Sequence, residues 1–178
     1  MLEEFSTLNF SSLFTNFLQR ALWLVALAAA QMMVFNHIHL LGYATPLPFV
    51  YLLLLFPLGT QRWSIMLWAF TCGLLVDTVS LSPGVAAGAM TLAAFIQPPL
   101  LRLMTPKDAP EDMQASFRTM GLWAYTNYAA IVTAVFAITY FALTAFTFFH
   151  ILDIVIALVS SWILTLFMCL LFETVRSK

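Results

Sequence analysis

The chain has 178 residues, of which 62% are apolar and only 8% are charged. A water-soluble domain carries roughly 25% charged residues, so this composition predicts a protein surrounded mainly by lipid, with no separate soluble catalytic domain. The net charge of −1 leaves no basic surface for binding nucleic acid.

Residues 1–19 form the first predicted unit, an amphipathic segment along the membrane interface. Its apolar side chains recur at helical spacing on one face, and polar side chains occupy the other face. The apolar residues are Phe10, Leu13, Phe14, Phe17 and Leu18. A water-exposed extension of the first spanning helix fits the same pattern equally well. Residues 20–178 form the second predicted unit, a single transmembrane domain.

Six apolar segments within residues 20–178 predict six transmembrane helices and an all-α integral membrane protein. The segments cover residues 20–36, 46–58, 62–76, 83–104, 121–149 and 154–172. Some are shorter than the about 20 residues that a straight crossing needs, which predicts local thinning of the bilayer or buried helix ends. The pair Pro98-Pro99 predicts a kink or an end within the fourth segment.

The basic residues support this number of spans. All seven Lys and Arg residues fall beside or within the first, third, fifth and seventh of the segments outside the predicted spans. Positively charged segments stay in the cytoplasm, so both termini and the loop 105–119 are predicted to be cytoplasmic. Within that loop, Pro110 and the acidic residues after it predict the start of a short surface helix.

The turn between the third and fourth predicted spans carries the clearest candidate site. Asp77 is the only acidic residue between Glu4 and Asp108, and an ionisable group at the edge of membrane helices is a functional candidate by default. Its carboxylate either binds a cation or a basic group of a partner, or caps the turn or the fourth helix; capping is the favoured interpretation. Gly84 and Gly88 stand four apart, which predicts a close helix contact.

Polar residues in the later spans are interpreted as contacts between helices. Asn127 is the most polar residue deep in the fifth predicted span and has no acidic partner on its own helix. We therefore expect it to bond a neighbouring helix. Ser160, Ser161 and Thr165 in the sixth predicted span are expected to do the same.

Three histidines and two carboxylates are predicted on the non-cytoplasmic side, namely His37, His39, Asp77, His150 and Asp153. These side chains could ligate zinc, but capping of helix ends explains them more simply. The sequence contains no G-x-S-x-G, H-E-x-x-H or Walker motif. We therefore predict no catalytic residue, no metal and no cofactor.

The pattern around Asp77 resembles the MreD family, the small membrane subunit of the bacterial rod-shape system. It consists of residues 73–77 (GLLVD), six intervening residues, residues 84–87 (GVAA) and then an apolar helix. Residues 36–46 (NHIHLLGYATP) are also similar to an MreD subgroup. The resemblance covers nearly the whole chain in length, number of spans and an inside N-terminus.

This resemblance implies a non-enzymatic scaffold of the cell-elongation complex in the bacterial inner membrane. It implies binding to MreC and cooperation with MreB filaments, a SEDS-type glycosyltransferase and a class B penicillin-binding protein in side-wall peptidoglycan synthesis. It also implies a fold similar to the substrate-binding subunits of energy-coupling-factor transporters.

Two other functions stay open from the sequence. One is a membrane subunit that binds a small vitamin-type molecule for transport, for which Ala26 and Ala30 would give the first span a small face toward a partner. The other is a metal-dependent intramembrane enzyme, which would hold zinc in stoichiometric amount.

Overall fold

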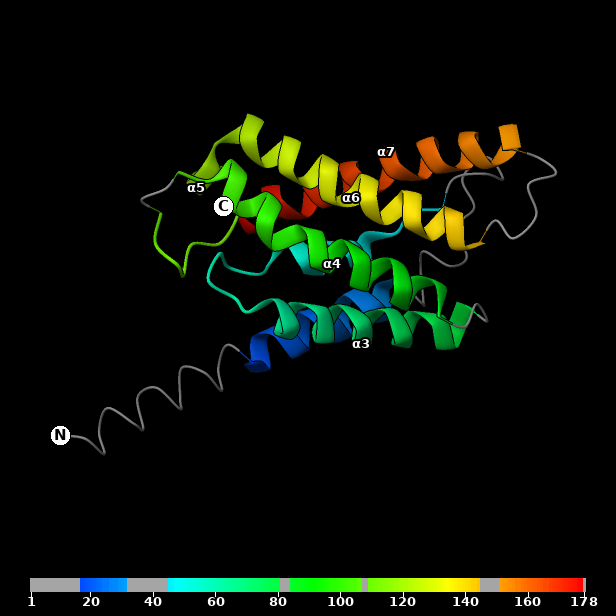
Figure 1. Ribbon diagram of the computed structural model, residues 1–178, viewed down its shortest axis with the longest axis horizontal. Coiled ribbons are helices and arrows are strands. Elements are labelled where there is room, and N and C mark those ends of the chain that lie inside the picture. Colours follow the sequence, from blue (N-terminus) through cyan, green and yellow to red (C-terminus); the bar gives the residue numbers. More distant parts are fainter. Residues whose placement is uncertain (1–16, 32–44, 81–83, 107–108, 145–150, 178) are drawn as a thin grey trace.

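The computed structural model describes residues 17–31, 45–80, 84–106, 109–144 and 151–177, and every regular element within these ranges is a helix (Figure 1). The prediction of an all-α fold is therefore confirmed. The elements are an N-terminal helix (Phe17–Gln31), a 3₁₀ turn η2 (Pro48–Val50), α2 (Tyr51–Leu54), α3 (Arg62–Ser80), α4 (Val85–Met104), α5 (Phe117–Met120), α6 (Leu122–Thr144) and α7 (Ile151–Arg176).

The long helices pack in chain order, α3 against α4, α4 against α6 and α6 against α7 (Figure 1). They alternate in direction, so their ends gather at two opposite ends of the molecule. At one, here called the charged end, α3 and α6 begin, α4 and α7 end, and α5 lies between. At the other, here called the Asp77 end, α3 and α6 end while α4 and α7 begin. The charged end carries Arg62, Arg102, Arg118 and Arg176.

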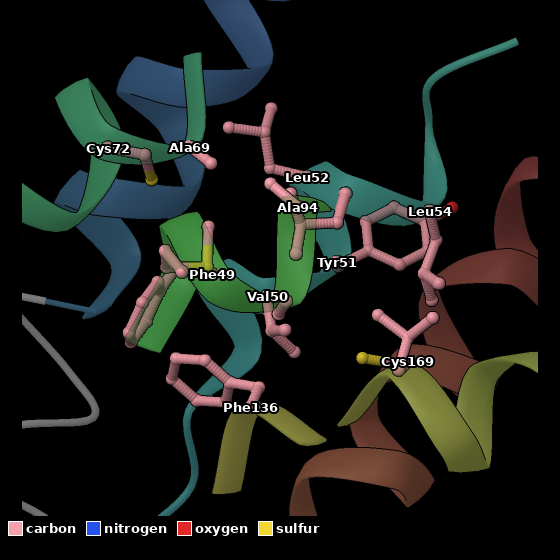
Figure 2. Close-up of a cluster of buried hydrophobic side chains, with 14 of the residues drawn as sticks. Phe49, Val50, Tyr51, Leu52, Leu54, Ala69, Cys72, Ala94, Phe136 and Cys169 are labelled. Carbon is pink, nitrogen blue, oxygen red and sulfur yellow. The ribbon is translucent and has the colours of Figure 1, made fainter. Parts of the chain in front are cut away.

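Residues 45–56 form an irregular buried segment in the middle of the bundle, where the sequence predicts a second spanning helix over residues 46–58. That prediction is wrong. Pro46 and Pro48 have no N–H to donate, so regular structure starts only at Pro48, as a 3₁₀ turn followed by a single α-helical turn. Figure 2 shows side chains of this segment, Phe49 and Tyr51 among them, packed between α3, α4, α6 and α7.

Side chains of the surrounding helices satisfy the backbone of this buried segment. The N–H of Thr45 donates to Ser161 Oγ, and the N–H of Leu47 donates to Thr165 Oγ1; each donor–acceptor distance is 3.1 Å. Gln31 Nε2 donates to the carbonyl of Pro46 over 3.3 Å. Unpaired backbone groups are costly to bury, so these bonds allow a non-helical segment in the core.

The sequence predicts that the hydroxyls on the last helix bond a neighbouring helix. Ser161 and Thr165 do bond another part of the chain, but it is the irregular segment and not a helix. The prediction is wrong for Ser160, which is only partly buried and whose hydroxyl donates to the carbonyl of Ile156 in α7 itself.

The predicted bounds of the third and fourth spans agree with α3 and α4 to within a few residues. Pro98 and Pro99 lie inside α4, which continues to Met104, so the helix does not end at the prolines. The predicted surface helix from Pro110 is absent from the described loop. The N–H of Leu58 donates to the carbonyl of Met113 at 3.0 Å, and the N–H of Gly59 donates to the carbonyl of Glu111 at 2.7 Å.

Those two bonds hold residues 111–113 against the turn before α3, which is incompatible with a helix there. The short helix starts later, at Phe117, behind a capping box. In it Ser116 Oγ accepts from the N–H of Thr119, and Thr119 Oγ1 accepts from the N–H of Ser116.

Two described helices, α6 and α7, are long and apolar enough to cross a membrane, where the sequence predicts six spans. The N-terminal helix is apolar but shorter within the described residues. The helices α3 and α4 are long enough, but α3 includes Arg62 and Asp77, and α4 includes Gln97, the two prolines and Arg102. These residues lower the mean hydropathy of α3 and α4. The length and hydropathy of the individual helices therefore support fewer spans than the six predicted from the order of apolar segments and basic residues.

The backbones of α3 and α4 approach each other closely at Gly73. A Cβ atom placed there would lie 2.4 Å from the Cα of Ala87 and 2.6 Å from its nitrogen. No side chain fits in that space, so only glycine allows the two backbones to meet.

We expect Gly73→Ala to destabilise the protein by about 1–3 kcal/mol or more, because the added methyl group must push the backbone of α4 away. Gly88→Ala is the matched control. Its Cβ would meet only the end of the Leu143 side chain, at 3.2 Å, which can move aside. Thermal unfolding of the purified variants in detergent measures the difference. Equal midpoints for the two variants would contradict a tight contact at Gly73.

Candidate functional site

The carboxylate of Asp77 binds the first turn of α4. Its Oδ1 accepts a hydrogen bond from the N–H of Ala86 and its Oδ2 accepts one from the N–H of Ala87; each donor–acceptor distance is 2.9 Å. The side chain is buried, with 4% of its surface exposed. A negative charge at the positive end of a helix, with two N–H donors aimed at it, is a favourable arrangement for a buried carboxylate.

The spacing of Gly73 and Asp77 explains this geometry. Residues four apart lie on one face of a helix, so both face the start of α4. Gly73 brings the two backbones together, and Asp77, one turn further along, then reaches the N–H groups of Ala86 and Ala87. The favoured interpretation of Asp77 as a cap agrees with these contacts, although the donors are nine and ten residues away and not within the adjoining turn.

The two glycines predicted to make the close contact have other roles. Gly84 precedes α4 with a φ of 86°, a left-handed conformation that glycine adopts without strain, and no described residue comes within 4 Å of a Cβ placed on it. Gly88 faces the side chain of Leu143 on α6. The correct small-residue contact is therefore Gly73 with Ala87, because spacing along α4 alone does not reveal which face meets α3.

Asn127 is exposed on α6, so the prediction that it bonds a neighbouring helix differs from the structure. The buried face of α6 contains Tyr125, Tyr128 and residues spaced three and four positions further on, and Asn127 lies off this face. The buried amide that makes the bond to a neighbouring helix belongs to α4. Gln97 Nε2 donates to the hydroxyl of Tyr128 over 2.7 Å.

The predicted histidine cluster lies mostly outside the described residues, since His37, His39 and His150 all do. Of its carboxylates, Asp77 caps α4 and Asp153 lies in the first turn of α7. No group of three metal-ligating side chains occurs within the part of the chain that the structure describes.

A second buried carboxylate, Glu173 on α7, lies near the charged end. Its Oε2 accepts hydrogen bonds from the hydroxyls of Tyr51 (2.9 Å) and Tyr125 (3.4 Å). Arg176, one turn along α7, forms a salt bridge with the same oxygen at 3.3 Å. Glu173 is fully buried, and among the described residues its Oε1 has no hydrogen-bond partner. These contacts tie α7 to the buried segment 45–56 and to the start of α6.

Glu173 was not among the predicted site residues, because it lies just beyond Phe172, where the last predicted span ends. A signal was present, since four residues with polar or polarisable side chains recur every fourth position along α7. They are Ser161, Thr165, Cys169 and Glu173, and all are buried. Such a stripe on an otherwise apolar helix indicates the face that contacts protein and not lipid.

Comparison of the chain with protein-family models, with curated proteins and with solved structures finds no match in any of the three.

We expect Asp77→Asn to destabilise the protein by about 1.5–3 kcal/mol, because the amide accepts only one of the two N–H bonds and turns its NH₂ group toward the other donor. Asp77→Leu removes both bonds and should cost more. Asp112→Asn, at an exposed position of the loop, is the matched control and should change little. Thermal unfolding of the purified variants in detergent gives the order of their stabilities. An Asp77→Asn protein as stable as the control would contradict the role of both oxygens in capping α4.

Proposed function

We propose that this chain is an MreD-type subunit, a non-enzymatic scaffold of the bacterial cell-elongation complex that binds MreC in the inner membrane. In that complex it would work with MreB filaments, a SEDS-type glycosyltransferase and a class B penicillin-binding protein. The observation that carries the proposal is the junction between α3 and α4.

The residues that resemble the MreD signature form one physical unit in this junction. Gly73 provides the close approach, Asp77 provides the cap, and Ala86 and Ala87 provide the small side chains and the N–H donors. Gly84 provides the left-handed turn before α4. A signature whose separated parts meet at one site is stronger support for the resemblance than the same residues scattered over the fold.

The distribution of charge supports a membrane placement with the charged end in the cytoplasm. Four arginines from different elements gather there, and the positive-inside rule assigns such an end to the cytoplasmic side. We infer six crossings, of which α6 and α7 are the two that satisfy length and composition. The buried segment 45–56 would cross as irregular chain, which is tolerated at membrane depth where protein surrounds it.

The contacts of that segment with α7 support a crossing. Thr45 bonds Ser161, in the first half of α7, and Tyr51 bonds Glu173, in its last turn. The segment therefore advances along much of α7 toward the charged end.

The filled interior favours a scaffold over the vitamin-binding alternative. A bound vitamin needs a cavity with converging polar groups. In the described residues, the middle of the bundle holds large side chains with 1% or less of their surface exposed, including Phe49, Tyr51 and Phe136 (Figure 2). Tyr128 is equally buried. The two buried carboxylates bond other protein groups, so their chemistry is used in holding the helices together.

The outer side of α7 offers a long surface for a partner helix or for lipid. Large apolar side chains recur along it at helical spacing and are 42–57% exposed; they are Ile156, Val159, Ile163 and Phe167. In contrast to α4, this helix is covered on one side only by the rest of the described chain.

Co-purification with MreC tests the proposal. The tagged chain, expressed together with the MreC protein encoded in the same genome, should retain MreC through detergent extraction and a wash at high salt. A tagged membrane protein with the same number of predicted spans and no role in elongation is the control. The chain should also restore rod shape to cells that lack their own MreD. Failure to retain MreC above the control level, from a well-expressed protein, would contradict the proposal.

A further inference from the structure

A pocket of about 280 Å³ opens at the charged end of the molecule. Its walls come from the N-terminal helix, from residues 52–57, from the loop before α5 and from the end of α7. The polar side chains that line it are Gln19, Arg20, Asp112, Gln114 and Arg176. Four parts of the chain therefore meet around this pocket, at the level where the membrane surface would lie.

Arg20 is the distinctive group in this pocket. Its guanidinium lies over the ring of Phe56, 5.2 Å from the ring centre, which holds the charge in place without neutralising it. Within the described residues, Arg20 forms no ion pair and no hydrogen bond. Its side chain is half-buried and lines the pocket beside Trp23, where no described residue supplies an acceptor for its N–H donors.

Among the described residues that line the pocket, Arg20 is the cation that forms no ion pair. Arg176 forms a salt bridge with Glu173 and donates to Gln114, so its charge is partly balanced and its position is fixed. Asp112 lies at the exposed rim. A planar guanidinium with free donors in a partly buried site is suited to an anion, and phosphate is the anion whose oxygens it binds best.

Much of the remaining lining of the pocket is apolar. It includes Trp23 on the N-terminal helix and Leu55 and Phe56 on the buried segment. A ligand with its anion on Arg20 would therefore have apolar surface alongside it. That combination fits a phospholipid better than a soluble phosphate compound.

We propose that this pocket binds the phosphate of an anionic phospholipid, with Arg20 as the main ligand and the start of the acyl chains against Trp23 and Leu55. The site depends on the membrane placement of the chain and not on MreC, so it can be tested on the purified protein alone. Binding would fix the N-terminal helix to the membrane surface and to the end of α7.

The test is native mass spectrometry of the full-length protein in detergent, titrated with phosphatidylglycerol and with phosphatidylcholine of the same chain length. Wild type should bind phosphatidylglycerol more tightly. Arg20→Gln should weaken that binding by roughly tenfold, since a charged hydrogen-bonded contact is lost. Arg102→Gln is the matched control, an exposed arginine at the same end that does not line the pocket. It should bind as wild type does.

Two further variants keep the test decisive. Arg20→Lys retains the charge and should keep most of the affinity, so it separates the loss of charge from any disturbance of the fold. Asp112→Asn removes the negative charge at the rim and should raise the affinity by roughly twofold or more, which tests the site even if Arg20→Gln does not fold. Equal affinity for the two lipids, unchanged binding by Arg20→Gln, or unchanged binding by Asp112→Asn would overturn the proposal. Glycerol 3-phosphate competing as well as the lipid would overturn its lipid part and indicate a soluble anion.

Discussion

The contact between Asp77 and the first turn of α4 is the interaction on which the packing of the long helices depends. It places a carboxylate against two N–H groups that have no partner within their own helix. It works only because Gly73, one turn earlier, lets the backbones of α3 and α4 meet. Since α4 in turn packs on α6, the angle and depth at which α4 enters the bundle follow from this contact.

The same logic applies at the charged end, with different groups. There the buried carboxylate belongs to Glu173, and the donors are the tyrosine hydroxyls of the central segment and of α6. Each carboxylate thus bonds elements that are distant in sequence. A buried ionisable group is expensive unless it is hydrogen-bonded, so both positions resist substitution for reasons of structure alone. This cost explains why polar residues are few but well connected in so apolar a chain.

The sequence predicted some parts of this fold well and others poorly, for reasons that can be given residue by residue. The bounds of α3 and α4 follow from apolar runs between Arg62 and Met104 that are interrupted by one polar turn. The capping role of Asp77 follows from its residue type next to a helix start. The glycine contact was assigned to Gly84 and Gly88 because spacing defines a face of a helix but not its neighbour, and the neighbour depends on tertiary packing.

The central segment and Glu173 could not be assigned from local pattern. A run of apolar residues between prolines has the composition of a short spanning helix, and its burial by four other helices becomes visible only in three dimensions. Its bonds to α7 join positions more than 100 residues apart, such as Thr45 with Ser161, where the separation is 116. Periodicity within one segment contains no information about such partners.

Membrane placement is the central claim, because both the scaffold function and the lipid site depend on it. It is tested most directly by reporter fusions at two points, one after Ser80 at the Asp77 end and one after Gln114 at the charged end. Paired alkaline phosphatase and green fluorescent protein reporters distinguish the two sides of the inner membrane. We expect phosphatase activity at Ser80 and fluorescence at Gln114, since the arginines gather at the second end. The same reporter active at both points would contradict the placement.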